Sequence, residues 1–221
     1  MIGWIVVICS VLLILICAFI LFLNPIKTWI EKNKFQKSVY RILHYYAAEE
    51  DQLLLNNVNL VFDKNAQEPY VFDHMLFADK YIYIISDYTK IGGLYGNIND
   101  QFLFLKDEKN QINKIFNPVI LNENKITELE RVFAIPHSDK MFVSVVVFNP
   151  SLVVPKELLK KEQTSWFLSL DELEKTIKKA EMDDVTPITH AQSEDMAKSI
   201  LARSDRTKKE ALAREKNFRR N

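Results

Sequence analysis

The residues best suited to chemistry lie in one short stretch near the middle of the chain. Asp73 and His74 stand side by side, and a second acid, Asp87, follows a run of apolar residues. Carboxylates bind hard cations such as Mg²⁺, and carboxylates and histidines can transfer protons. The four histidines are scattered without metal-ligand spacing, and the sequence has no glycine-rich phosphate loop, His-Glu-x-x-His or Gly-x-Ser-x-Gly motif. The stretch around Asp73 is therefore the main candidate for a functional site.

The elements that would position this stretch are predicted by the spacing of apolar residues. Apolar positions three and four apart indicate helices over 34–48, 120–134 and 170–180. Runs rich in aromatic and β-branched residues indicate strands over 53–60, 71–77, 81–85, 101–105, 141–148 and 166–168. This order predicts an α/β domain in which helices pack on a sheet.

Local signals refine this outline. Gly92, Gly93 and Gly96 fall close together, which predicts a tight turn or a close approach of the backbone. Ser169 with Glu172 has the spacing of a capping box at the start of the last helix of the domain. The nearly continuous apolar run over 141–148 is typical of a strand buried on both faces.

The first 23 residues predict a membrane anchor. No charged side chain occurs from Ile2 to Leu23, and a helix of this length spans roughly 33 Å, enough for the hydrocarbon core of a bilayer. A cleavable signal peptide is the alternative, but no basic side chain precedes the run, and the residues after it form a poor cleavage site. We expect an uncleaved transmembrane helix over 1–23.

The residues after the anchor predict its orientation. Lys27, Lys32, Lys34 and Lys37 follow it with a single acid, Glu31, among them. Basic flanks stay in the cytoplasm, so we expect the amino terminus outside the cell and the rest of the chain inside. The segment 24–34 is expected to be a juxtamembrane linker and 35–181 the domain.

The carboxyl-terminal segment 182–221 has a different character. It begins with polar residues that favour a linker, and over 198–221 lysines and arginines outnumber acids. We expect a polar basic tail that is solvated and partly disordered, although it could be helical. Its functional interpretation is attraction to anionic lipid head groups or to nucleic acid.

Composition excludes several classes of protein. The formal net charge is zero, which argues against coating of nucleic acid by bulk electrostatics. Two cysteines, both within the predicted anchor, exclude a disulfide scaffold and a multi-cysteine zinc module. The sequence also shows no base-reading helix and no aromatic stacking platform, so sequence-specific recognition of nucleic acid is not expected.

Six segments follow one another over roughly 35–179: Leu55-Asn56-Asn57-Val58, Phe72-Asp73-His74, the apolar strand that ends at Ser86-Asp87-Tyr88 before the glycines, Phe116-Asn117-Pro118, Val145-Val146-Val147-Phe148, and Leu168-Ser169-Leu170-Asp171-Glu172-Leu173. Their order and spacing resemble the nuclease-related domain (NERD) family. The resemblance implies a restriction-endonuclease-like sheet flanked by helices.

The resemblance also implies which residues would carry catalysis. Asp73 stands at the position of the family's first metal-binding acid, whereas Ser86 and Tyr88 occupy the positions of its Glu-x-Lys pair. A second acid of that family would fall near Gln36. Nuclease chemistry of this type needs two carboxylates for Mg²⁺ and a lysine near the attacking water. The sequence therefore predicts a degenerate site in which Asp73 is a remnant.

Two functions follow from this interpretation. The first is a single-pass membrane protein whose catalytically inactive NERD-like domain is a cytoplasmic binding or scaffolding module for nucleic acid, with no cofactor. The alternative is an active Mg²⁺-dependent nuclease that uses Asp73 with Asp87 or another acid. Side chains alternate along a strand, so if Ser86 and Tyr88 face the site, Asp87 is expected to face away.

Overall fold

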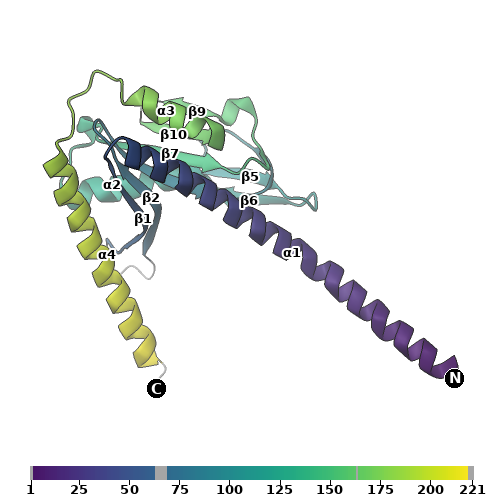
Figure 1. The fold of residues 1–221 in the computed structure, drawn as a ribbon. Helices are drawn as coiled ribbons and strands as arrows, with labels where there is room; N and C mark the ends of the chain where they lie inside the picture. The colour runs from purple at the N-terminus through teal and green to yellow at the C-terminus, as the bar shows by residue number, and fades with distance from the viewer. Residues whose placement is uncertain (1, 63–68, 163, 219–221) are drawn as a thin grey trace. The chain divides into compact units, whose positions relative to one another are not determined.

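The structure is a computed structural model that describes the backbone of residues 2–62, 69–162 and 164–218 (Figure 1). Side chains are described over 26–62, 69–137, 139–159 and 164–204. The chain divides into two compact units, residues 1–38 and 39–221.

The chain begins with one long helix, α1 (Ile2–Glu49). It includes the predicted helix over 34–48 and also 24–34, which we expected to be a linker. Lysine, a good helix former, occurs three times in that segment, together with one glutamate, Glu31. The predicted anchor over 2–23 lies outside the residues whose side chains are described. Among the described residues, no helix combines the length and apolar character needed to cross a membrane.

A six-stranded sheet forms the centre of the unit 39–221. Its order is β1 (Leu53–Leu60), β2 (Tyr70–Phe77), β3 (Ile82–Tyr88), β7 (Phe142–Phe148), β10 (Ser165–Ser169) and β9 (Lys160–Glu162). Strands β1, β2 and β3 are antiparallel neighbours, whereas β7 runs parallel to both β3 and β10. The expected mixed α/β architecture is confirmed at this level.

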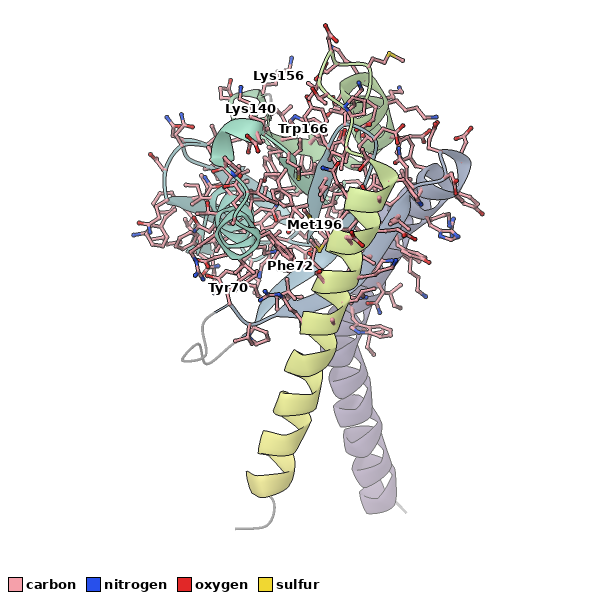
Figure 2. The ribbon with its side chains drawn as sticks, turned by 90° about the vertical axis from the view of Figure 1, so that its left-hand side faces the viewer. Tyr70, Phe72, Lys140, Lys156, Trp166 and Met196 are labelled. Atoms are coloured by element: carbon pink, nitrogen blue, oxygen red, sulfur yellow. The ribbon has the colours of Figure 1, made fainter. Side chains whose placement is uncertain are left out.

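One face of this sheet packs against helices α2 (Pro118–Phe133) and α4 (His190–Phe218). The apolar cluster there joins Met75 and Ile84 of the sheet with Ile126 of α2 and Ile200 of α4. Met196 of α4 also packs on this cluster (Figure 2).

The opposite face carries the end of α1 and the short helix α3 (Leu173–Ala180). Tyr40 of α1 stacks on His74 of β2, and Lys178 of α3 lies over the ring of Tyr46. All seven residues of β7 are buried because helices and strands cover both of its sides, as the apolar run predicts.

A second, smaller sheet has the order β6 (Ile112–Phe116), β5 (Phe102–Lys106), β4 (Gly92–Tyr95) and β8 (Leu152–Val153). It shares a second apolar core with the first sheet, in which Leu94 and Leu103 meet Val146 and Phe167. Two of the three clustered glycines, Gly92 and Gly93, lie within β4, and Gly96 directly follows it. Gly92 has φ +120°, and a Cβ there would lie 2.2 Å from the carbonyl oxygen of Lys106, so the prediction of a close approach is correct.

Two local predictions differ from the structure. Ser169 does not cap a helix, because its hydroxyl bonds the Glu172 carboxylate at 3.1 Å, and a 3₁₀ turn, η3 (Leu170–Glu172), comes before α3. The compact unit also extends past residue 181. Helix α4 packs on β1, and its buried residues include Ala197, Ile200 and Ser204. Because Ala197 is small and Ser204 is polar, Ile200 alone does not give a strong apolar pattern.

The amino-terminal cap of α2 is a buried asparagine. The Asn117 side-chain oxygen accepts the Val119 N–H at 3.0 Å, and Pro118 occupies the first turn, where its missing N–H costs nothing. The Asn117 amide nitrogen donates to the carbonyls of Ile98 and Asp100 at 2.6 and 2.9 Å. This one side chain therefore fixes the start of α2 to the loop before β5.

Replacing Asn117 with alanine should destabilise the fold by about 2 kcal/mol, since it removes a cap and leaves two carbonyls without their donor. Chemical denaturation of the full chain in mild detergent, followed by near-ultraviolet circular dichroism, measures this. Asn124→Ala, an exposed position of the same helix, is the matched control and should change stability little. Equal stability of the two variants would contradict this role for Asn117.

Candidate functional site

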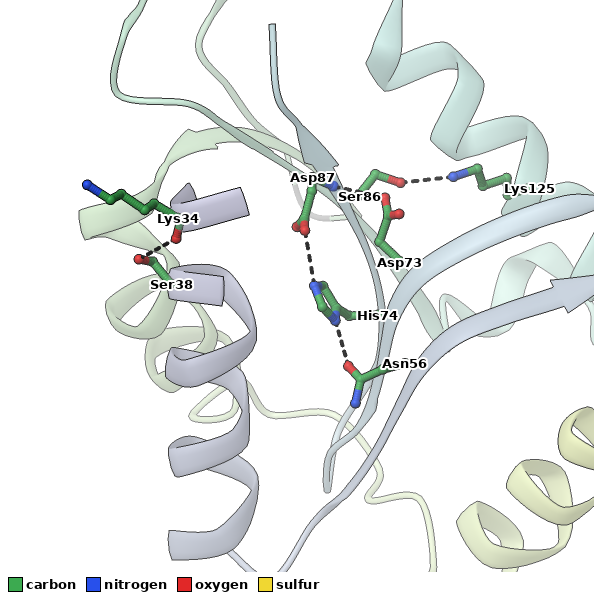
Figure 3. Close-up of polar contacts among 8 residues, drawn as sticks. All are labelled: Lys34, Ser38, Asn56, Asp73, His74, Ser86, Asp87 and Lys125. Atoms are coloured by element: carbon green, nitrogen blue, oxygen red, sulfur yellow. Dashed lines mark hydrogen bonds and ion pairs between the residues drawn. The ribbon is translucent and has the colours of Figure 1, made fainter. Parts of the chain in front are cut away.

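Asp73 lies on β2, beside the end of β3. Its Oδ2 accepts a hydrogen bond from the backbone N–H of Asp87 at 3.0 Å. Ser86 lies on the same side of the sheet as Asp73, and Lys125 reaches this side from α2 (Figure 3). The candidate remnant acid is thus held by the neighbouring strand and lies near a cation.

The position of α2 over this site is fixed by Asn122. This side chain is fully buried, and its amide nitrogen donates to the carbonyl of Ile84 at 2.8 Å and to the hydroxyl of Ser144 at 3.0 Å. Its oxygen accepts the Ser86 hydroxyl at 2.7 Å. Because these contacts reach both β3 and β7, they set the height and rotation of α2 above the sheet.

Lys125, one turn after Asn122, supplies the ammonium group of the site. Its Nζ donates to the Ser86 hydroxyl at 3.0 Å and lies 5.7 Å from the centre of the Phe72 ring. Burial lowers the pKa of Lys125 below its usual range, and the negative charge of Asp73 opposes that change. The site therefore holds one carboxylate and one lysine on the same side of the sheet, and the Ser86 hydroxyl links the lysine to Asn122.

Sequence reasoning missed Lys125 and Asn122. The resemblance places the family's lysine at the position of Tyr88, two residues after Ser86, whereas Lys125 comes from a helix far along the chain. The only sequence signal was the spacing of Asn122 and Lys125, which places both on nearly the same face of α2 as Ile126 and Leu129.

Tyr88 does not line this site. Its ring packs edge-on against Phe167 at 6.3 Å between centres, in the second core. Within the described part of the chain its buried hydroxyl has no hydrogen-bond partner, and burial raises its pKa. Of the two positions that correspond to the Glu-x-Lys pair, only Ser86 is beside Asp73.

The second acid, Asp87, points to the opposite face of the sheet, as strand alternation predicts. Its Oδ2 lies 3.3 Å from Nε2 of His74, and Nδ1 of His74 lies 2.6 Å from the side-chain oxygen of Asn56 (Figure 3). The side chains of His74 and Asp87 are only 7% and 2% exposed. Asn56, His74 and Asp87 therefore form a buried polar chain across β1, β2 and β3.

His74 links the other two members of this chain. When Nδ1 of His74 donates to Oδ1 of Asn56, the contact between Nε2 of His74 and Oδ2 of Asp87 requires a proton on one of those two atoms. Burial raises the pKa of Asp87, while its contact with His74 lowers it by a smaller amount. Asp87 is committed to this internal contact and is not directed at Asp73.

The residues around Asp73 do not fit a Mg²⁺ site. Such a site needs several oxygen ligands. Among the side chains that the structure describes, Asp73 is the acid at this position, and one of its oxygens is already bonded to the backbone. Lys125 adds a competing positive charge. Across the described residues, no group of three or more acids, histidines or cysteines is arranged to hold a metal ion.

Comparisons with known proteins add no further information on this site. No family model matches the sequence, and no similar protein was found among curated proteins or solved structures.

The raised pKa of Asp87 should make the free energy of unfolding depend on pH. Because that pKa is raised, the folded state binds more protons than the unfolded state upward from about pH 4, and the free energy of unfolding should fall as pH rises through this window. Asp87→Asn cannot ionise, and its amide can still donate to His74, so the fall should be smaller. Urea unfolding of the full chain in detergent at a series of pH values tests this.

Asp184→Asn, at an exposed position, provides the control and should keep the wild-type pH dependence. If Asp87→Asn and Asp184→Asn have the same pH dependence, Asp87 is not the group responsible.

Proposed function

We propose that this chain is a single-pass membrane protein whose α/β unit is a cytoplasmic binding module for nucleic acid without nuclease activity. The observation that supports this proposal is the separation of the two acids. Asp73 and Asp87 project from opposite faces of the sheet, and each is engaged by its own partners. Two carboxylates on opposite faces cannot share the metal ion on which hydrolysis would depend.

The polar groups beside Asp73 hold the fold together and are not arranged for hydrolysis. Ser86 and Asn122 use their hydrogen bonds to hold α2 on the sheet. Lys125 is partly buried, and the carboxylate next to it reduces its attraction for an anion. The motif order that resembles the NERD family, together with the mixed sheet flanked by helices, supports nucleic acid as the class of ligand.

One observation favours the alternative, a Mg²⁺-dependent nuclease centred on Asp73. Lys125 brings to Asp73 the ammonium group that the Tyr88 position lacks. Activity would still require a second acid at this position, and Asp87 is turned to the other face. We therefore place this function second.

The membrane location follows from the uncharged segment over 2–23 and from the lysines after it, which favour a cytoplasmic domain. In this proposal the bilayer is the first partner of the chain. The basic segment 198–221 adds attraction to anionic lipid or nucleic acid. Within its described part, Lys198 pairs with Glu194 at 3.0 Å and Arg203 lies over Phe133, so these two residues also contribute to the fold.

The full chain, purified in mild detergent, should not cleave single- or double-stranded DNA or RNA with Mg²⁺ or Mn²⁺, because the ion lacks a second carboxylate. Gel electrophoresis of labelled substrates measures this. Asp73→Asn and the exposed Asp79→Asn should match the wild type. Cleavage that disappears in Asp73→Asn and persists in Asp79→Asn would establish the nuclease instead.

The membrane proposal has its own test. Alkaline carbonate should leave the full chain in the membrane pellet, and deletion of 2–23 should release it, since this deletion removes the uncharged segment. A carboxyl-terminal tag should resist protease added to intact cells and become sensitive after permeabilisation. Release of the full chain by carbonate would exclude the anchor, and digestion in intact cells would reverse the orientation.

A further inference from the structure

The small sheet has one face in the second core and one face outside it. Leu94, Leu103 and Leu105 point into the core. Because side chains alternate along a strand, the other face carries the intervening residues. We call this surface the aromatic face, and it consists of Gly93, Tyr95, Phe102, Phe104, Lys106, Ile112, Lys114, Phe116 and Val153.

Aromatic rings dominate the centre of the aromatic face. Tyr95 and Phe104 are directly paired across β4 and β5, and they are 50% and 45% exposed. Phe102 is paired with Phe116 across β5 and β6, with ring centres 5.2 Å apart. Four rings thus lie next to one another on a pleated surface, at the spacing of cross-strand neighbours.

Glycine makes room for one of these rings. A Cβ at Gly93 would lie 3.0 Å from the hydroxyl oxygen of Tyr95 and 3.1 Å from the nearest carbon of its ring. The phenol of Tyr95 therefore occupies the space above Gly93 and lies along the sheet. In this arrangement the ring lies against the sheet and does not project from it into solvent.

The charged residues of the aromatic face are both positive. Lys114 is paired with Phe104, and its Nζ lies 4.1 Å from the centre of the Phe102 ring. Lys106 is at the end of β5, paired with Ile112. No acid occupies an outward position on these four strands, all of which are described. The nearby acid Asp107 accepts the backbone N–H groups of Lys109 and Gln111, which directs it into the turn between β5 and β6.

We propose that the aromatic face binds a single strand of RNA or DNA, with bases stacked on Tyr95 and Phe104 and phosphates near Lys106 and Lys114. Every base has a face that can stack on an aromatic ring, and lysines beside the rings attract the backbone. This inference rests on the proposed function and assigns its ligand to a surface distinct from the Asp73 site. No stacking platform was evident in the sequence, because the four rings become neighbours only in the folded sheet.

Two features favour this ligand over a lipid surface. Insertion between lipid head groups requires apolar side chains that reach roughly 5–10 Å into the bilayer. Here Tyr95 lies over Gly93, and Lys114 lies over Phe102, so both rings stay close to the sheet. Such rings offer stacking surfaces but little depth of insertion.

The experiment uses the full chain in nanodiscs of neutral phosphatidylcholine and a fluorescein-labelled 20-nucleotide oligo(U) or oligo(dT). Fluorescence anisotropy should show binding that weakens with salt. Tyr95→Leu and Phe104→Leu should each lower affinity about tenfold, because leucine keeps apolar bulk but cannot stack. Phe104→Trp should bind as well as the wild type or more tightly. Lys114→Gln should reduce the dependence of log affinity on log salt by roughly 0.7.

Tyr45→Leu is the matched control, because Tyr45 is an exposed ring of α1 outside the aromatic face. It should bind as the wild type does. Thermal unfolding of each variant shows that loss of binding is not loss of folding. Absence of binding by the wild type would overturn the proposed nucleic-acid-binding function as well, whereas unchanged binding by Tyr95→Leu and Phe104→Leu would overturn only the assignment to the aromatic face.

Three outcomes would overturn the inference. The first is absence of binding by the wild type. The second is equal binding by the wild type, Tyr95→Leu and Phe104→Leu, with loss of binding when residues 205–221 are removed, which would assign nucleic acid to the tail. The third is reduced sedimentation of these variants with phosphatidylserine vesicles but unchanged oligonucleotide binding, which would assign the aromatic face to lipid.

Discussion

Side chains along strands β2 and β3 alternate between the two faces of the sheet, and the chemistry of this protein depends on this alternation. It sends Asp73 and Ser86 to the face under α2, and His74 and Asp87 to the face under α1. A shift of either strand by one residue would bring the acids together but would move the apolar residues of that strand to the wrong faces. The hydrophobic core therefore keeps the carboxylates apart. Each is then neutralised separately, one near a lysine and the other against a histidine.

Most of the main sheet was predictable from sequence because its strands are dense in apolar residues. The runs over 53–60, 71–77 and 141–148 correspond closely to β1, β2 and β7. The orientation of Asp87 followed from alternation alone. Helix α2 was also predicted, since Ile126 and Leu129 mark its buried face.

The remaining features depend on contacts between distant residues, which a single sequence does not encode locally. Lys125 reaches Asp73 only because Asn122 fixes the rotation of α2. The strand β4 was not predicted, because its glycines indicated a turn or a close approach of the backbone and gave no strand pattern. The aromatic face was missed because its rings come from three short strands. Once Leu94 and Leu103 are known to be buried, the alternation of side chains along these strands shows that the rings lie on the outer face.

Helix α4 packs on β1, the edge strand of the large sheet. As the first strand in the sheet order, β1 has a partner on one side only, and the backbone N–H of Asn59 instead donates to the hydroxyl of Ser204 at 3.2 Å. The unpaired backbone N–H and C=O groups of an exposed edge strand can pair with another chain and start aggregation. The carboxyl-terminal helix thus contributes to colloidal stability. Chains shortened before residue 190 would expose β1 to association with their own copies.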